Sequence, residues 1–168
     1  MKFEEVIRKR TAIRSFSDKS VEKEKLDKIL EAGRIAPTAK NKQPIKIYVV
    51  QSHDGISKID MASRCRYGAK TVLVVCGNKE EAYQSGDSNT YEIDSCIVAT
   101  HMMLEATNQN VDNIWIEVFD KNILRKEFNI PDSLVPVCLI PLGYKTKDCP
   151  VNPLHDIRKN INDIVEYK

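Results

Sequence analysis

Two arginines near the start of the chain are the clearest candidates for ligand chemistry. Arg10 and Arg14 lie four residues apart in the segment RTAIRSF, and each is followed by a hydroxyl residue, Thr11 and Ser15. A guanidinium group binds phosphate oxygens in a bidentate manner, and a neighbouring hydroxyl supplies a further hydrogen bond. If residues 10–14 keep a helical turn, both arginines point the same way. We predict an anion site here; the alternative is a solvated cationic helix end that offsets the helix dipole.

The loop APTAKNKQP at residues 36–44 is a second candidate site, because it runs directly into the apolar–polar run IKIYVV. Pro37 and Pro44 stiffen its two ends, so the amides of Asn41 and Gln43 are held in place. Rigid amides beside a core strand suit a flat heterocycle that carries both donors and acceptors. An ordinary connecting loop is the alternative interpretation.

The remaining polar residues do not form a known catalytic pattern. The three histidines are dispersed, and the five cysteines include no C-x-x-C pair, so we expect no metal site. His101 is interpreted as a hydrogen-bonded packing residue and Cys96 as a residue that faces the core. No G-x-G-x-x-G or Walker loop is present. If the protein is an enzyme, a cofactor is therefore expected to carry the chemistry.

Composition narrows the class of protein further. The 168 residues predict one domain, and a net charge of +2, from 26 basic and 24 acidic side chains, provides no field for nucleic acid or an anionic membrane surface. The start of the chain lacks an apolar stretch of signal-peptide length, and the longest apolar runs are strand-length. We expect a reduced, cytoplasmic protein.

Five helices are predicted from apolar spacing, capping residues and prolines. The first is expected at residues 2–9, and the second from an N-cap at Ser20 to Pro37. The third is expected to run for about ten residues after a cap at Asp54. The fourth is expected from an Asn89/Glu92 capping box to about residue 109, and the fifth between a cap at Asp120 and Pro131. In the tail, Ile157, Ile161, Ile164 and Val165 have a helix-like spacing, which a tail that packs on a partner could also use.

Four strands are predicted between these helices, at residues 45–50, 71–76, 113–118 and 135–144. The run 71–76 is nearly all apolar, which indicates a central strand covered on both faces. The polar stretch 77–89 contains two glycines and is predicted to be a mobile surface segment. Strands separated by helices indicate a layered α/β or α+β domain.

Several segments together resemble the nitroreductase family, which comprises FMN-dependent flavoproteins that oxidise NAD(P)H. RTAIRSF resembles its N-terminal arginine motif, and APTAKNKQP resembles its Ala-Pro-Ser-x-x-Asn-x-Gln-Pro loop with Thr38 in place of serine. The family's central helix is similar to IDSCIVATHMMLEA, and the strand whose end lies over the flavin is similar to VDNIWIEVFD. The family's last core strand is similar to LVPVCLIPLGY. The resemblance implies an α+β fold for residues 1–168, a three-layer α/β/α domain with a mainly antiparallel four-stranded sheet plus a possible partner-chain strand.

The resemblance also implies an FMN site and the residues that form it. Arg10 and Arg158 are expected to bind the phosphate, Thr11 and Ala12 to line the ribityl and phosphate region, and Arg14 to reach flavin N1 and O2. A cation at that edge favours flavin reduction electrostatically.

The other residues implied by the resemblance surround the flavin ring. The loop residues Pro37, Thr38, Ala39 and Asn41 are expected to cover the ring, often from the opposite subunit of a homodimer. The backbone at Glu117 and Val118 is expected to approach N5 and O4. Gly143 is expected to allow a close approach near the phosphate, and Arg64 is a weaker candidate for the polar edge of the ring.

Three positions of the chain depart from the family pattern. Ala12 stands where many members have serine, and Ile45 stands where many have an aromatic residue. Asn110, Val111 and Asp112 replace the commoner Gly-Leu-Gly. These departures are compatible with FMN binding but leave the identity of the substrate open.

The activity implied is hydride transfer from NAD(P)H, through flavin N5, to a nitroaromatic, a quinone or a similar small acceptor. A protein of the same fold that binds, stores or modifies flavin without turnover is one alternative. A domain that binds another phosphate ligand through Arg10 and Arg14 is the other.

Overall fold

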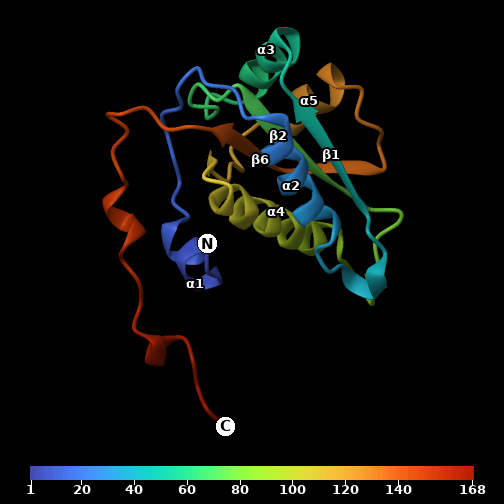
Figure 1. Ribbon diagram of the computed structural model, residues 1–168. Coiled ribbons are helices and arrows are strands. Elements are labelled where there is room, and N and C mark those ends of the chain that lie inside the picture. Colours follow the sequence, from blue (N-terminus) through green and yellow to red (C-terminus); the bar gives the residue numbers. More distant parts are fainter.

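A computed structural model describes all residues, 1–168, as an antiparallel sheet with helices on both faces (Figure 1). The sheet has the strand order β1-β2-β6-β5, and every neighbouring pair is antiparallel. Its strands are β1 Ile45–Val50, β2 Thr71–Asn78, β5 Asp112–Asn113 and β6 Leu134–Gly143. This architecture confirms the predicted α+β fold with four antiparallel strands.

Strand β2 is the buried centre of the sheet, as its apolar sequence predicts. Val72 and Val74 belong to the core on one face, and Leu73 and Val75 belong to the core on the other. Successive side chains of a strand point to opposite faces, so an apolar run fills both cores. The four central residues are fully buried.

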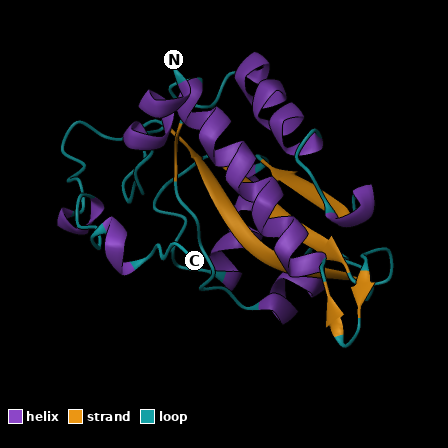
Figure 2. Ribbon diagram, turned by 90° about the horizontal axis from the view of Figure 1, so that it is seen from below, coloured by secondary structure: helices purple, strands orange, loops and turns teal.

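Two helices cover each face of the sheet. On one face are α3 His53–Ala62 and α5 Lys121–Glu127, and on the other are α2 Lys23–Arg34 and α4 Tyr91–Asn108. Figure 2 shows the long helix α4 lying across the sheet. The short helix α1 Phe3–Lys9 packs against α4. All five predicted helices are present.

Three predicted helix starts are wrong, each by a few residues. The N-cap residue of helix α2 is Glu22 rather than Ser20, and Val21 just before it is buried. The cap of α3 is Ser52, whose Oγ accepts a hydrogen bond from the Gly55 N–H at 3.1 Å, and Asp54 lies in the first turn.

Helix α4 begins after Thr90, and the predicted Asn89/Glu92 capping box is not formed. Asn89 Oδ1 accepts from the Tyr91 N–H, but Glu92 accepts from the Tyr91 hydroxyl instead of returning to the backbone. The Asp120 cap of α5 is confirmed, with its carboxylate accepting from two backbone N–H groups at 2.8 and 3.1 Å. Helix α5 ends at Glu127, so Pro131 does not end it.

The predicted strand 113–118 is mostly irregular, and Pro141 of β6 explains why. Only Asp112 and Asn113 pair with β6 as a ladder, and Ile116 forms a single bridge with Leu139 in the same register. Leu139 and Ile116 donate backbone hydrogen bonds to each other. In an antiparallel ladder the backbone of the residue two positions further along points toward the same neighbour, and in β6 that residue is Pro141. Proline has no N–H to donate, and the ladder is interrupted there.

Two segments fold differently from their predictions. Residues 77–89 are not one loop, because β2 continues to Asn78 and a hairpin follows, β3 Gln84–Ser85 with β4 Ser88–Asn89.

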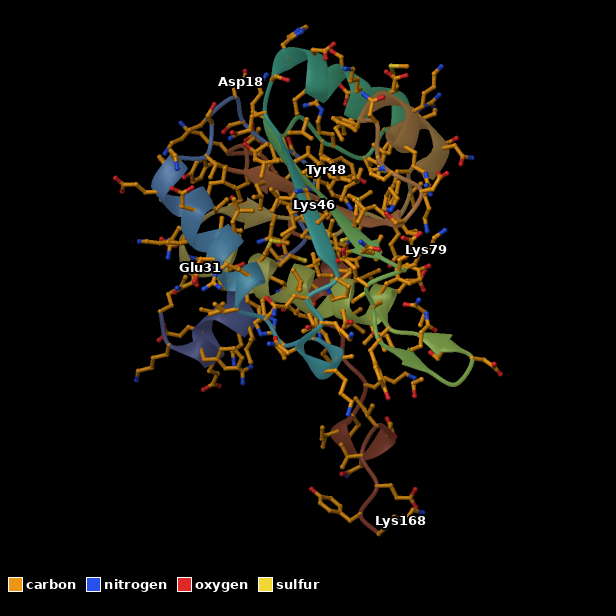
Figure 3. The ribbon with its side chains drawn as sticks, turned by 90° about the vertical axis from the view of Figure 1, so that its right-hand side faces the viewer. Asp18, Glu31, Lys46, Tyr48, Lys79 and Lys168 are labelled. Carbon is orange, nitrogen blue, oxygen red and sulfur yellow. The ribbon has the colours of Figure 1, made fainter.

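The tail isoleucines do not form an α-helix. The tail contains two 3-10 turns, η2 Pro153–His155 and η3 Ile161–Asp163, and extends away from the domain to Lys168 (Figure 3). No helix is long and apolar enough to span a membrane.

Candidate functional site

The segment that carries Arg10 and Arg14 is extended, so the predicted helical turn is wrong. Helix α1 ends at Lys9, Ala12 forms a parallel bridge with Asn113, and the Ile13 N–H donates to the Asn113 carbonyl at 3.2 Å. In extended backbone, alternate residues share a face. Arg10, Ala12 and Arg14 therefore lie on one side of the segment, which gives the predicted common direction by a different geometry.

Five of the predicted site residues line one cavity of about 280 Å³. They are Arg10, Thr11, Ala12, Arg14 and Arg158. Residues that the sequence did not single out complete its wall: Asn152, Leu154 and His155, which come from the η2 turn of the tail. The first part of the tail lies beside the N-terminal segment here, so Arg10 and Arg158, which are 148 positions apart in the sequence, line the same cavity.

The cavity is strongly cationic. Partial burial lowers the pKa of Arg10 from its usual value, and the like charge of Arg158 lowers it further. Positive groups that destabilise one another in a shared cavity are stabilised by an anion placed between them. The cavity therefore fits a phosphate or another multiply charged anion.

The ion pairs of the chain separate its eight arginines into two groups. Four of them pair with a carboxylate: Arg8, Arg34, Arg66 and Arg125. The other four have no carboxylate within ion-pair distance, and they are the four that the sequence assigned to a ligand: Arg10, Arg14, Arg64 and Arg158. Arg158 donates only to the Ile157 carbonyl. Arg64 is exposed and does not line the cavity.

The predicted loop Pro37–Asn41 is anchored to the first turn of α4. The carboxylate of Asp94 accepts hydrogen bonds from the Ala39 N–H at 2.8 Å and from the Thr90 hydroxyl at 2.9 Å, and Asp94 is 1 % exposed. Within the loop, Thr38 Oγ1 accepts from the Gln43 N–H at 2.9 Å. Lys40, Asn41 and Gln43 have left-handed backbone with φ between 51° and 53°, which non-glycine residues adopt at a cost.

The loop and the arginine cavity lie at opposite ends of α4. The loop contacts the first turn of that helix, whereas the Arg10–Arg14 segment pairs with Asn113, just beyond its last turn. An 18-residue helix is roughly 27 Å long, which approaches the diameter of a small domain. The loop residues and the cavity residues of one chain are thus not brought together.

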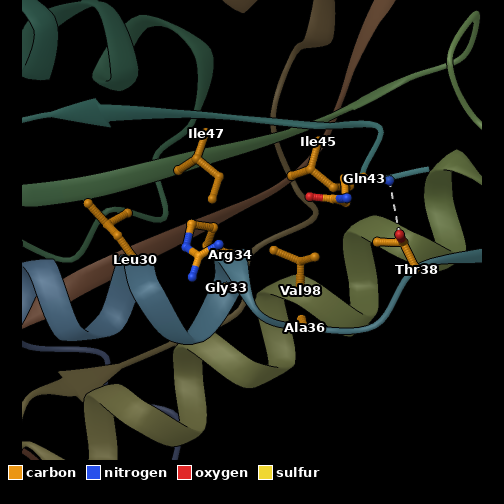
Figure 4. Close-up of a pocket in the computed structure, with 9 residues that line it drawn as sticks. All are labelled: Leu30, Gly33, Arg34, Ala36, Thr38, Gln43, Ile45, Ile47 and Val98. Carbon is orange, nitrogen blue, oxygen red and sulfur yellow. Dashed lines mark hydrogen bonds between the residues drawn. The ribbon is translucent and has the colours of Figure 1, made fainter. Parts of the chain in front are cut away.

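A second cavity, of about 220 Å³, lies behind the loop, between α2, β1 and α4 (Figure 4). Thr38 and Gln43 line it, and Ile45 and Ile47 form its apolar wall. Ile45 is the position where many relatives were expected to carry an aromatic side chain. The Ile45 side chain borders the open space of the cavity.

Glu117 and Val118 present unpaired backbone donors. Both residues are exposed, and neither of their N–H groups donates to an acceptor in the chain. The Trp115 indole N–H donates to the Glu117 carboxylate at 3.1 Å, and the Ser63 hydroxyl donates to the Val118 carbonyl at 2.7 Å. These contacts fix the backbone while its N–H groups stay available to a ligand.

Gly143 lies at the end of β6, beside the core rather than in the cavity. A Cβ atom at this position would come within 3.0 Å of the Phe16 ring.

Cys96 is half-buried instead of facing the core, and burial is the main cause that raises the pKa of its thiol. His101 donates to or accepts from no other side chain, but its Nδ1 lies 2.9 Å from the Ile97 carbonyl, as a hydrogen-bonded packing residue would.

The model of the nitroreductase family matches residues 7–67 and 60–144. The chain belongs to the nitroreductase family. A solved nitroreductase family protein from Clostridium difficile is 37 % identical, with a TM-score of 0.93 and coverage of 100 % of this chain and 99 % of that one. A curated relative from Methanothermobacter thermautotrophicus, provisionally named NADH dehydrogenase/NAD(P)H nitroreductase, is 27 % identical over 163 residues, which are 90 % of this chain and 82 % of that protein.

One further solved structure bears on the fold. A nitroreductase from Exiguobacterium sibiricum, solved in complex with FMN, covers 100 % of this chain and 98 % of its own, with a TM-score of 0.87 and 22 % identity. At that identity the likeness shows the shared fold.

Asp94 is a structural anchor of this nitroreductase, because its buried carboxylate holds the Pro37–Asn41 loop. Replacing Asp94 by Ala leaves the Ala39 N–H without its acceptor, so the free energy of unfolding is expected to fall by about 1–3 kcal/mol. Urea unfolding measures the change. Asp94→Asn, which keeps one acceptor oxygen, is the matched control and should lose less. An Asp94→Ala variant as stable as wild type would show that the carboxylate does not anchor the loop.

Proposed function

We propose that this nitroreductase binds FMN and uses it to pass hydride from NAD(P)H to a small acceptor of the nitroaromatic or quinone class. The observation that carries the proposal is the set of arginines without carboxylate partners, three of which line one cavity. Apart from Arg64, the arginines outside the cavity are each paired with Asp or Glu. The cavity cations are best explained by a ligand that brings its own negative charge.

The donor groups of the chain fit the parts of FMN. Arg10 and Arg158 supply the charge that a phosphate needs, and Thr11 adds a hydroxyl group. Arg14 lies further along the same side of the extended segment. The free N–H groups of Glu117 and Val118 are donors of the kind that a flavin ring edge accepts.

Bound FMN would supply the hydride chemistry, and the chain would bind it and tune it. Arg10 and Arg158 would hold the phosphate. Arg14 would place a fixed positive charge where reduction adds negative charge, which favours the reduced state electrostatically. No side chain of the cavity is required to transfer hydride, which accords with the lack of a catalytic dyad or triad in the sequence.

We also propose that residues 1–168 act as one domain in a homodimer that shares its FMN sites. The loop Pro37–Asn41 lies too far from the arginine cavity of its own chain to cover a ligand bound there. A second copy would bring its loop to that cavity. Apolar side chains are available for the contact, because Ile93 on α4 and Ile157 and Ile161 in the tail are 58–66 % exposed.

The names of relatives support the nicotinamide part of the proposal. The relative from Methanothermobacter thermautotrophicus carries NAD(P)H in its provisional name, and a similar structure from Staphylococcus epidermidis is described as an NAD(P)H:FMN oxidoreductase. The cavity behind the loop at Ile45 is a place where acceptor choice in this chain would differ from that of relatives with an aromatic residue.

The phosphate assignment predicts a loss of FMN affinity in two single variants. Arg10→Ala and Arg158→Ala each remove a charge-assisted contact worth about 1.5–3 kcal/mol, so the dissociation constant should rise roughly ten- to a hundredfold. Quenching of flavin fluorescence on titration measures it. Arg8→Ala is the matched control, because Arg8 is paired with Glu4 and exposed. Affinities that match wild type in both cavity variants would rule the phosphate site out.

The shared-site proposal predicts complementation between two defective chains. One chain carries Arg10→Ala and Arg158→Ala, and the other carries Asn41→Ala with Thr38→Ala. Mixed dimers contain one site with both defects and one intact site, so FMN binding should reappear at up to half the wild-type capacity of the mixed dimers. The measurement is FMN bound per isolated mixed dimer. If loop and cavity belong to the same chain, every site keeps a defect and no binding returns.

The oxidoreductase function predicts that NADH or NADPH bleaches the flavin absorbance of the FMN-loaded protein under anaerobic conditions. Addition of a quinone or nitroaromatic should then restore the absorbance. A protein that only stores or modifies flavin would bind FMN and stay coloured with both nicotinamides. A protein that binds another phosphate ligand would take up no FMN at all.

A further inference from the structure

The cavity behind the loop lies between one side of α2 and one face of β1 (Figure 4). Ile45 and Ile47 are two positions apart in β1, so their side chains point to the same face. Leu30 and Arg34 are four positions apart in α2 and therefore lie on the same side of that helix. Val98 of α4 forms the third wall. All three elements pack on one hydrophobic core, so the fold itself fixes the walls of the cavity.

The apolar part of the lining is only partly covered by the chain. The hydrophobic lining residues are Leu30, Ala36, Ile45, Ile47 and Val98. Ala36 and Val98 are buried, whereas Leu30, Ile45 and Ile47 are half-buried. A ligand with an apolar body would remove the remaining surface of these three side chains from water, which favours its binding.

The polar part of the lining offers hydrogen-bond donors that the chain does not use. Gln43 Nε2 donates to the Asn41 carbonyl at 3.1 Å, and its second hydrogen has no acceptor. Thr38 Oγ1 accepts from the Gln43 N–H at 2.9 Å, and its own hydrogen has no acceptor in the chain. Figure 4 shows the Gln43 side-chain amide directed toward the space between Ile45 and Val98. Free donors beside apolar walls suit an aromatic ligand that carries acceptor oxygens.

The charge of this cavity differs from that of the arginine cavity. Arg34 is the only ionised side chain in the lining, and its guanidinium pairs with the Glu31 carboxylate at 2.6 Å. The Arg10 and Arg158 side chains have no such partner. A ligand in the cavity behind the loop therefore meets no uncompensated cation, and a neutral molecule is favoured over a carboxylate.

The volume of the cavity, about 220 Å³, limits the size of the ligand. An apolar cavity of about 150 Å³ holds benzene. Pockets for drug-sized ligands have about 300–1,000 Å³. One aromatic ring with a small substituent fits between these limits, whereas a flavin or a nicotinamide nucleotide does not.

We propose that this cavity is a binding site for a neutral, single-ring aromatic compound with acceptor oxygens, as in a nitro or a carbonyl group. The ring packs against Ile45 and Ile47, and an oxygen accepts a hydrogen bond from Gln43. The cavity shares no lining residue with the arginine cavity. The inference therefore goes beyond the proposed function and does not rest on FMN.

The test is a titration of the full-length protein with nitrobenzene, without nicotinamide, followed by NMR of the methyl groups. The signals of the methyl-bearing side chains of the cavity should shift together and saturate at one ligand per chain. They are those of Leu30, Ile45, Ile47 and Val98. Toluene has the same ring and no acceptor oxygen, so it should bind about two- to tenfold more weakly, because one hydrogen bond is lost. Benzoate, which is charged, should also bind more weakly than nitrobenzene.

Two variants separate the apolar contact from the hydrogen bond. Ile45→Phe places a second ring in the cavity and should lower the nitrobenzene affinity by roughly ten- to a hundredfold, since the two rings would overlap. Ile35→Phe is the matched control, because Ile35 is 65 % exposed and does not line the cavity. Gln43→Met keeps the length of the side chain and removes the amide. It should lower the affinity for nitrobenzene to that for toluene and leave toluene binding unchanged.

Thermal unfolding shows whether each variant is folded, and Gln43→Met keeps the proposal testable if Ile45→Phe does not fold. Nitrobenzene that shifts none of the four cavity residues, or binds a folded Ile45→Phe protein as tightly as wild type, would place the ligand elsewhere and overturn the proposal. Equal affinities for nitrobenzene and toluene, or tighter binding of benzoate, would overturn the assigned chemistry. These titrations need no FMN, so failure of the phosphate site in the Arg10→Ala and Arg158→Ala measurements is a separate result.

Discussion

The contacts of Asn113 determine where the candidate site forms. Its side-chain amide donates to the Met103 carbonyl at 3.1 Å and to the Thr107 hydroxyl at 3.2 Å, which ties the end of α4 to the sheet. Its backbone pairs with β6 on one side and with the Ala12–Ile13 segment on the other. Asn113 is 1 % exposed, and its pairing with Ala12 and Ile13 holds the extended segment that carries Arg10 and Arg14.

The architecture that follows divides the binding groups between the ends of one helix. Asp94 holds the Pro37–Asn41 loop at the start of α4, and Asn113 holds the arginine segment just beyond its end. A rigid helix of this length keeps the two groups apart in every copy of the chain. Two copies arranged in opposite directions would bring each loop to the other chain's cavity, and two equivalent sites would then form together.

Much of this was predictable from sequence, and the failures have local physical causes. The apolar run of β2 indicates burial, and the Asp120 cap is a hydrogen bond to nearby backbone. The arginine pattern is also visible in the sequence itself, because it depends on residues close together in the chain. The break at residues 114–115 depends on Pro141, which is distant in the chain, so alternation alone indicated a longer strand. The contribution of His155 to the cavity depends on the path of the tail, which is distant in sequence from Arg10. No periodicity carries that information.

The location of Arg158 has a thermodynamic consequence for the tail. The tail leaves the domain after β6, and most of its side chains from Val151 onward are exposed, so little apolar burial holds it in place. An anion that bridges Arg10 and Arg158 adds a contact that the tail makes only when it lies beside the N-terminal segment. Ligand occupancy and tail order are therefore linked equilibria, and each stabilises the other by the same free energy. Cellular proteases, which cleave exposed extended chain, would then discriminate between loaded and empty protein.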